Sequence, residues 1–452
     1  MASNERMART SERLGNGLGD GNGLSWTCGA CMVVGAQEPV IVEKDRQIIR
    51  ELAKRVAHIA AKEEQEVKKS LWLRHNALQE TRPLIFCDPE NAWYEIIPSD
   101  KLKCEGNLAR IWEFKLRKEI CWSEKIKDDR VIESNFRVQY VYENSSRGLD
   151  VKIIGGENDG AHCWEAPLKD YNDLERMAFR RIVVNHGKTQ QLFNLAKEVL
   201  GDILEVNLEG SWWWSHGMTT DVIHLRGFEQ MLVDLYDDQD GLCRLMAFLR
   251  DENLARLDFL EQNGLLSLNN GGDFIGTGGY GWSSELPSAG FDAKKVRTSD
   301  LWGFCESQET IGVSPDMFEK FIFPFQLPIL ERFGLNIYGC CEPLDKRWNV
   351  IKRIPRLRKV TVSPWSNVDI MAEKIGKDYI YCRKVNPSFI STLQMDEENV
   401  RKELRDTFKA TARNNCRVQV LMRDIVTLSG QPENAIRWTQ IAREEAENVY
   451  KQ

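Results

Sequence analysis

Short apolar segments alternate with helix-length amphipathic segments through most of the chain, and this alternation limits the possible folds more than any other feature. Polar, Gly or Pro residues end each apolar segment, as expected for strands. We predict eight strands, at residues 84–88, 137–143, 203–209, 265–270, 335–340, 359–365, 379–385 and 416–422. Apolar strands separated by helices are typical of parallel sheets, and eight such units predict a (β/α)8 TIM barrel of the α/β class. An open, doubly wound sheet is the alternative.

The regions around the predicted barrel have a different composition. Residues 1–40 are rich in Gly, Ser and Asn, which predicts a flexible tail. Residues 41–80 carry apolar residues at helical spacing and are expected to form a helical lead-in before a barrel over residues 81–452. Residues 95–165 are expected to form a strand-rich elaboration beside the barrel. Helices are predicted at 219–235 and 241–262, the second ended by Asn263 and Gly264.

Composition excludes several classes of protein. The chain has 61 Lys and Arg against 68 Asp and Glu, a net charge of −7, and no basic block, so nucleic acid is not an expected partner. A continuous apolar run long enough to span a membrane is missing from the sequence. The first 40 residues lack the apolar core of a secretory signal, so we expect a cytoplasmic protein whose twelve cysteines are reduced thiols or metal ligands.

The segment 334–343, Gly-Leu-Asn-Ile-Tyr-Gly-Cys-Cys-Glu-Pro, places unusual chemistry at the end of a strand. Pro343 cannot continue a ladder, so Cys340, Cys341 and Glu342 are expected where the strand gives way to a loop. Thiolates with a carboxylate suit zinc that keeps a position open for substrate. Two buried cysteines without a metal are the alternative. The Cys28 and Cys31 pair in the tail has no second pair nearby and is a weak metal or redox signal.

Other polar and aromatic residues follow the predicted strands and are expected to share one end of the barrel. His216 and Asp273 are candidate acids or bases. The tryptophans near strand ends suggest an aromatic wall for a flat substrate, with Trp212, Trp214, Trp282 and Trp365 as candidates. Residues 276–281 match Gly-x-Gly-x-x-Gly, but no helix pattern follows, so we expect a mobile lid and no phosphate loop.

Several segments together resemble the uroporphyrinogen decarboxylase superfamily, and within it the corrinoid-linked methyltransferases. The resemblance covers roughly residues 80–445. It is carried by Val313-Ser-Pro-Asp-Met-Phe-Glu-Lys-Phe-Ile-Phe-Pro-Phe, the segments 334–343 and 360–369, Val385-Asn-Pro-Ser, and Gly430-Gln-Pro-Glu-Asn-Ala-Ile-Arg-Trp438. The resemblance implies a (β/α)8 barrel with its site at the carboxyl ends of the strands.

The two branches of this superfamily imply different chemistry. Decarboxylases hold substrate carboxylates with arginines after the first strand, whereas residues 87–95 here carry Asp88, Glu90 and Glu95. A polycarboxylated substrate would be repelled there, which argues against a decarboxylase-like lyase. This lyase is kept as the alternative function. A non-catalytic binding protein is a further one.

The methyltransferase branch implies a zinc site. Tyr338 stands where the family's His-x-Cys motif has histidine, Cys340 stands at the cysteine, and a later cysteine falls near Asp424. The implied ligands are Cys340 or Cys341, Glu342 and Asp424. The resemblance implies transfer of a methyl group to or from a corrinoid on a separate protein, with zinc activating either a thiol acceptor or the ether oxygen of a donor. The tryptophans favour a small methoxylated aromatic donor. Our hypothesis is that zinc polarises its oxygen, His216 or Asp273 assists proton movement, and Co(I) of the partner takes the methyl group.

Overall fold

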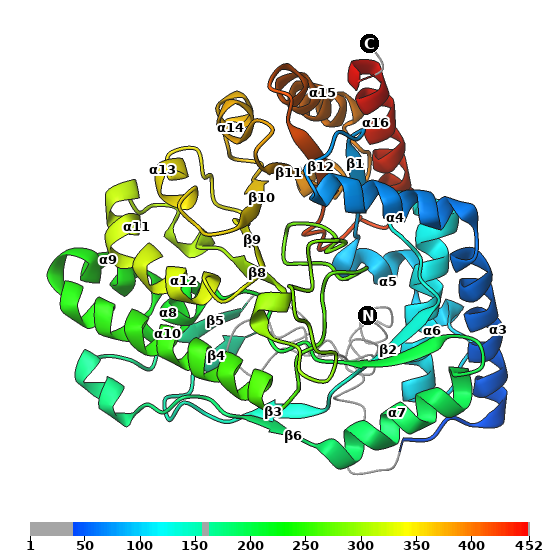
Figure 1. The fold of residues 1–452 in the computed structure, drawn as a ribbon, viewed down its shortest axis with the longest axis horizontal. Helices are drawn as coiled ribbons and strands as arrows, with labels where there is room; N and C mark the ends of the chain where they lie inside the picture. The colour runs from blue at the N-terminus through cyan, green and yellow to red at the C-terminus, as the bar shows by residue number, and fades with distance from the viewer. Residues whose placement is uncertain (1–38, 156–161, 451–452) are drawn as a thin grey trace.

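A six-stranded parallel sheet forms the centre of the computed structural model, which describes residues 39–155 and 162–450 (Figure 1). Its strands pair in the order β1, β12, β11, β10, β9 and β8, and every neighbouring pair is parallel. The strands span Leu84–Cys87 (β1), Trp302–Cys305 (β8), Leu335–Tyr338 (β9), Leu357–Val362 (β10), Ile380–Lys384 (β11) and Arg417–Met422 (β12). The α/β class expected from the sequence is therefore confirmed.

A second parallel pair, β2 (Asn135–Gln139) and β7 (Glu205–Glu209), stands apart from this sheet in hydrogen bonding. Within the described residues, no ladder joins β1 to β2 or β7 to β8. The closed barrel therefore stays a prediction. Two antiparallel pairs, β3 (Tyr142–Asn144) with β6 (Ile182–Val184) and β4 (Lys152–Gly155) with β5 (His162–Glu165), form a strand-rich region beside the sheet.

One predicted strand is wrong, and one strand of the six-stranded sheet was not predicted. Residues 265–270 form no strand; instead the Asn269 side chain donates to the Trp302 carbonyl at 3.0 Å and accepts from the Trp302 N–H at 2.9 Å. The missed strand, β8, has four residues and contains Gly303. A Cβ on Gly303 would lie 2.6 Å from both Asn336 and Phe333, so glycine is required by packing although it weakens a strand pattern.

Helices cover the sheet and the β2–β7 pair. They span Glu43–Ala60 (α3), Glu63–Asn76 (α4), Trp93–Ile96 (α5), Asn107–Cys121 (α6), His186–Leu200 (α7), Thr219–Arg226 (α8), Phe228–Asp237 (α9), Gln239–Gln262 (α10), Pro315–Phe321 (α11), Phe323–Leu330 (α12), Trp348–Ile351 (α13), Val368–Ile375 (α14), Glu397–Arg413 (α15) and Glu433–Tyr450 (α16). The lead-in consists of two helices. The predicted helix over 219–235 is also two helices, because Gly227 at φ 95° interrupts it.

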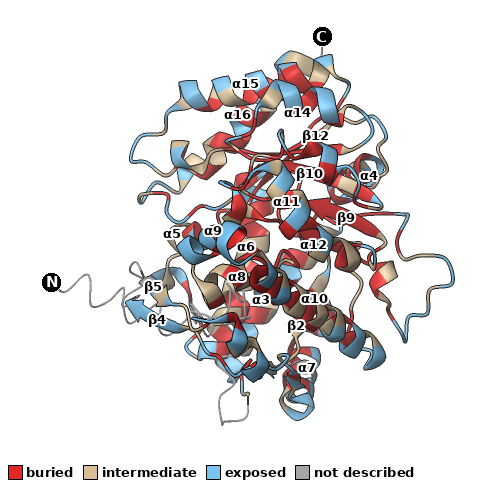
Figure 2. Ribbon diagram, turned by 90° about the vertical axis from the view of Figure 1, so that its left-hand side faces the viewer, coloured by how far each residue is buried: buried red, intermediate tan, exposed pale blue. Residues whose placement is uncertain are grey.

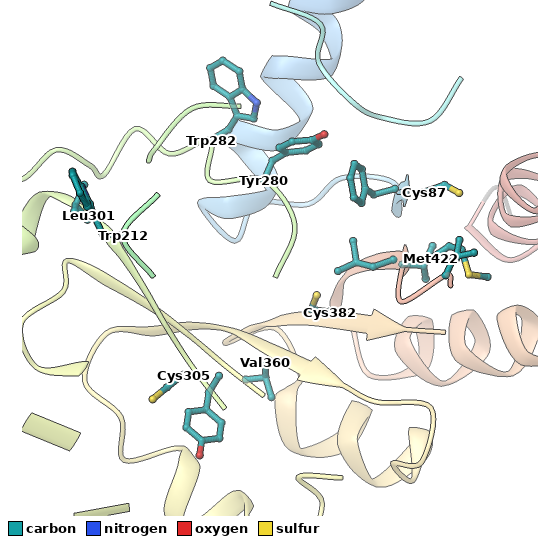
Figure 3. Packing of buried hydrophobic residues seen from close by; sticks show 14 of the residues in the cluster. Cys87, Trp212, Tyr280, Trp282, Leu301, Cys305, Val360, Cys382 and Met422 are labelled. Atoms are coloured by element: carbon teal, nitrogen blue, oxygen red, sulfur yellow. The ribbon is translucent and has the colours of Figure 1, made fainter. Parts of the chain in front are cut away.

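The glycine-rich segment Gly276–Gly281 is not a mobile lid; it packs against the inner face of the sheet. The Gly278 carbonyl accepts from Gln419 Nε2 at 2.6 Å and from Lys359 Nζ at 2.8 Å. The Cys382 thiol, which points from β11 toward this segment in Figure 3, donates to the Thr277 carbonyl at 3.1 Å. A Cβ on Gly278 would lie 2.6 Å from Ile337. Small residues are therefore needed because the backbone itself fills the interior.

Buried residues concentrate on the strands and the inner faces of the helices, while the outer faces of the helices are exposed (Figure 2). None of the described helices is long and apolar enough to cross a membrane. The predicted tail through residue 38, including Cys28 and Cys31, lies outside the described residues.

Candidate functional site

Two thiols, an ammonium group and a carboxylate meet beyond the carboxyl ends of β9, β11 and β12. The Cys340 and Cys341 sulfurs are 3.7 Å apart. Lys384 Nζ lies 3.0 Å from Cys341 Sγ and 3.5 Å from Cys340 Sγ, and it forms a close ion pair with Asp424. We call these four side chains the thiol centre. The parallel strands bring them together because their carboxyl ends share one edge of the sheet.

The two thiols of the centre differ in acidity. The hydrogen bond with Cys340 and the Lys384 ammonium lower the pKa of Cys341 to about 7, although burial opposes this shift. The pKa of Cys340 is raised well above its ordinary value by its hydrogen bond with Cys341 and by burial. One thiolate and one thiol are therefore expected to share a proton near neutral pH. Burial lowers the pKa of Lys384, but Cys340, Asp424 and Cys341 outweigh it and the net shift is upward.

Glu342 supports the backbone of the centre. Its two carboxylate oxygens accept from the Ser307 N–H at 2.8 Å and the Cys340 N–H at 2.9 Å. Burial raises the pKa of Glu342, and these two N–H groups oppose the shift. The carboxylate predicted as a zinc ligand therefore fixes the turn after β9 relative to the end of β8.

Glu90 fixes the conformation in which Asp424 reaches the centre. Asp424 has φ 62° and Glu90 has φ 48°, both in a region that side chains other than glycine rarely adopt. The Glu90 carboxylate accepts from the Asp424 N–H at 2.7 Å and pairs closely with Arg423. Burial raises the pKa of Glu90, and Arg423 opposes that shift. This acid in residues 87–95 thus binds the chain's own loop after β12.

A buried carboxyl group follows β8. Glu306 is buried, and burial together with Glu309 and Glu342 raises its pKa well above the ordinary range. Its side chain accepts from the Ser215 hydroxyl at 3.0 Å and from the Gln308 N–H at 3.0 Å. Because a raised pKa favours the protonated form, this buried carboxyl is a candidate proton donor.

His216 and Asp273 lie in clusters of their own. His216 is buried, with Nδ1 3.2 Å from Asn253 Oδ1 and its ring against Trp213 and Phe333; burial lowers its pKa to about 3. Asp273 forms a close ion pair with Arg137, which also contacts Glu209. The structure does not bring either side chain into contact with the thiols, and we assign neither a catalytic role.

Of the four candidate tryptophans, Trp214 packs against the buried cluster that contains Cys340. Trp214 and Cys341 lie against the same buried cluster, which includes Cys340 and Phe304. Trp212 is buried and donates to the Leu265 carbonyl at 3.0 Å. Trp282 is buried beneath Lys69, and Trp365 is 69% exposed. Trp214 is therefore the candidate for contact with a flat substrate.

Two donor–donor distances in the centre agree with those expected in a tetrahedral zinc site. A tetrahedral site with zinc–sulfur bonds of about 2.3 Å separates two sulfurs by about 3.8 Å and a sulfur from a carboxylate oxygen by about 3.5 Å. The corresponding distances are 3.7 Å for the two sulfurs and 3.7 Å from Cys341 Sγ to Asp424 Oδ2. As the described side chains lie, no three His, Cys, Asp or Glu residues form a group that could hold a metal ion. Lys384 Nζ instead contacts all three donors.

Three residues of this region were missed by sequence reasoning. Lys384 is the last residue of β11 and looks like an ordinary charge at a strand end. Glu90 matters only through its contact with a loop 334 positions later in the chain. Glu306 follows β8, which was not predicted. The one usable signal was that Arg383 and Lys384 end a short apolar segment, since charges buried with a strand require counter-charges.

Comparisons with known proteins leave the family open. No family model and no curated protein matches the chain. A structural neighbour is a methyltransferase. This solved structure from Methanosarcina mazei is 10% identical in sequence, and the match covers 84% of this chain and 98% of that chain with a TM-score of 0.46. Similarity at this level does not transfer an activity, so the function is argued from the residues of the site.

Proposed function

We propose that this protein is a methyltransferase of the corrinoid-linked type, which moves a methyl group from a small methoxylated aromatic donor to a corrinoid on a separate protein. The thiol centre carries this proposal, because it gathers two soft sulfur donors, one carboxylate and one cation at a single sheet edge. Cys340, Cys341 and Asp424 would hold the zinc ion. Glu342 is left out of the ligand set, since backbone N–H groups engage both of its oxygens.

The same proposal includes a (β/α)8 barrel in which the β2–β7 pair completes the six-stranded sheet. Two backbone hydrogen bonds support it at the two gaps. The Asp129 N–H, shortly before β2, donates to the Ile85 carbonyl of β1 at 2.9 Å. The His216 N–H, shortly after β7, donates to the Phe304 carbonyl of β8 at 3.0 Å. Each gap is thus bridged by one backbone hydrogen bond.

The side chains around the centre have separable roles in this reaction. Zinc at the thiols would supply Lewis acidity toward the ether oxygen of the donor. The Trp214 ring, which packs against the same buried cluster as Cys341, offers apolar surface on which an aromatic donor could stack. When the methyl–oxygen bond breaks and the methyl group leaves to the corrinoid, the oxygen keeps the bonding electrons and takes a proton. Glu306, whose pKa is raised by burial, is the candidate donor of this proton.

A decarboxylase-like lyase is less well supported by the charges near the centre. Holding a polycarboxylated substrate requires cations that are not already neutralised. Lys384 pairs with Asp424, Arg423 pairs with Glu90, and Arg383 pairs with Glu403 at 2.8 Å. These three cations are therefore committed to the protein's own carboxylates.

Methyl transfer can be tested with a panel of aromatic methyl ethers such as 2-methoxyphenol as donors and cobalamin reduced to Co(I) in solution as the acceptor. We expect methylcobalamin and the free phenol in equal amounts. The Cys340→Ala, Cys341→Ala double variant should lose this activity, whereas Cys243→Ala, a half-buried cysteine on α10, should keep it. No transfer from any ether, or full turnover by a folded double variant, would refute the proposal.

A further inference from the structure

The thiol centre contains its own cation. Lys384 Nζ contacts Cys340 Sγ at 3.5 Å, Cys341 Sγ at 3.0 Å and the Asp424 carboxylate more closely still. Among the described residues, these three side chains are the hydrogen-bond and ion-pair partners of this ammonium group. The three groups it contacts are also the three proposed zinc ligands.

Lys384 is buried in the folded protein. The Lys384 side chain is only 2% exposed, so its charge depends on these neighbours for stabilisation. The adjacent Arg383 is directed elsewhere, to Glu403 and to the Ser363 carbonyl at 2.5 Å. Lys384 therefore is not a surface charge that happens to lie near the cysteines, since the strand carries it into the centre while its neighbour points to another partner.

A metal ion and this ammonium group cannot bind the same donors together. A zinc ion about 2.3 Å from both sulfurs would lie next to Lys384 Nζ, which contacts the same two sulfurs. The two positive charges would then repel each other. The flexible stem of lysine allows its ammonium group to move without moving β11.

We propose that Lys384 is a built-in competitor for the metal: its ammonium group holds Cys340, Cys341 and Asp424 close together and is displaced when a divalent metal ion binds them. This inference rests on the zinc ligands of the proposed function. It adds a positioning residue that sets the metal affinity of the site and keeps the three donors gathered before metal arrives.

Zinc affinity measured by competition with a fluorescent zinc chelator tests this directly. Lys384→Met should bind zinc at least about tenfold more tightly than the unchanged protein, because the competing cation is gone. Lys374→Met is the control. Lys374 is an exposed residue of α14 that donates to the Asp345 carbonyl at 2.6 Å, so the zinc affinity of this variant should be unchanged. Equal or weaker binding by a folded Lys384→Met variant, or no zinc binding by either protein, would overturn the proposal.

A second measurement uses the unchanged protein and so does not depend on how the variant folds. Reductive methylation of lysines with formaldehyde, followed by peptide mass spectrometry, reports how accessible Lys384 is. We expect zinc to increase labelling of Lys384 severalfold and to leave labelling of Lys374 unchanged; equal Lys384 labelling with and without zinc would overturn the proposal. Loss of methyl transfer with normal zinc effects at Lys384 would refute the proposed function alone.

Discussion

Replacing Lys359 by Met should change how the stability of this protein depends on pH. Lys359 lies on β10, fully buried, with Nζ 2.8 Å from the Gly278 carbonyl and 2.8 Å from the Tyr280 carbonyl. Burial lowers its pKa from 10.5 to about 7. Both carbonyls keep another donor in the variant, Gln419 for Gly278 and Asn76 for Tyr280. The substitution thus removes the buried charge without leaving either acceptor unpaired.

The sign follows from proton binding. Between pH 7 and pH 10.5 the unfolded chain holds a proton on Lys359 that the folded chain has lost, so unfolding takes up a proton and stability rises with pH. For this shift the rise from pH 7 to pH 9.5 is about 3 kcal/mol. Below pH 7 both states are protonated and the full cost of the buried charge is present. The variant lacks this term altogether.

The assay is urea unfolding of both proteins at several pH values between 7 and 9.5. The difference in unfolding free energy, unchanged protein minus Lys359→Met, should rise by about 3 kcal/mol over this range. Taking the difference cancels groups that titrate equally in both proteins. A difference that stays constant to within about 0.5 kcal/mol would show that Lys359 remains charged when buried, and would refute this account of the interior.

Two further substitutions test the packing and the site. Gly278→Ala should lower the free energy of unfolding in urea by about 1–3 kcal/mol, because the new Cβ would lie 2.6 Å from Ile337. Gly312→Ala, where a Cβ would meet open space, should have little effect. Equal effects of the two substitutions would contradict the packing of the segment around Gly278. Glu90→Gln should weaken zinc binding measurably by releasing Asp424. Glu95 is the control: its carboxylate accepts from the Leu428 and Gly430 N–H groups further along the same loop, and Glu95→Gln should leave zinc affinity unchanged. Unchanged affinity in both variants would remove Glu90 from the site.

Local patterns predicted much of the fold. Seven of the predicted strands overlap strands of the structure, because buried parallel strands are continuous apolar runs that stop at turn residues. The strand at 302–305 was missed because it is short and contains Gly303. The role of Gly276–Gly281 was also misjudged, because a glycine-rich segment has the same composition whether it covers a site or fills an interior. Only its contacts with Gln419, Lys359 and Cys382 distinguish the two.

From the residues alone, the site was predictable only where its members are adjacent in sequence, and Asp424 was indicated only by the family resemblance. Cys340 and Cys341 could be identified because two thiols directly follow a strand. The positions of His216 and Asp273 could not be predicted, since each occupies a cluster made by distant residues, Asn253 and Phe333 for His216 and Arg137 for Asp273. Lys384 and Glu90 likewise depend on which strands become neighbours.

The metal content of the purified protein tests the central claim most directly. The protein and its Cys340→Ala, Cys341→Ala variant would be expressed with added zinc, purified without chelator and measured by inductively coupled plasma mass spectrometry. We predict about one zinc ion per chain in the unchanged protein and almost none in the folded variant. Equal zinc in both proteins, or no metal in the unchanged protein, would contradict the zinc-holding role of the thiol centre.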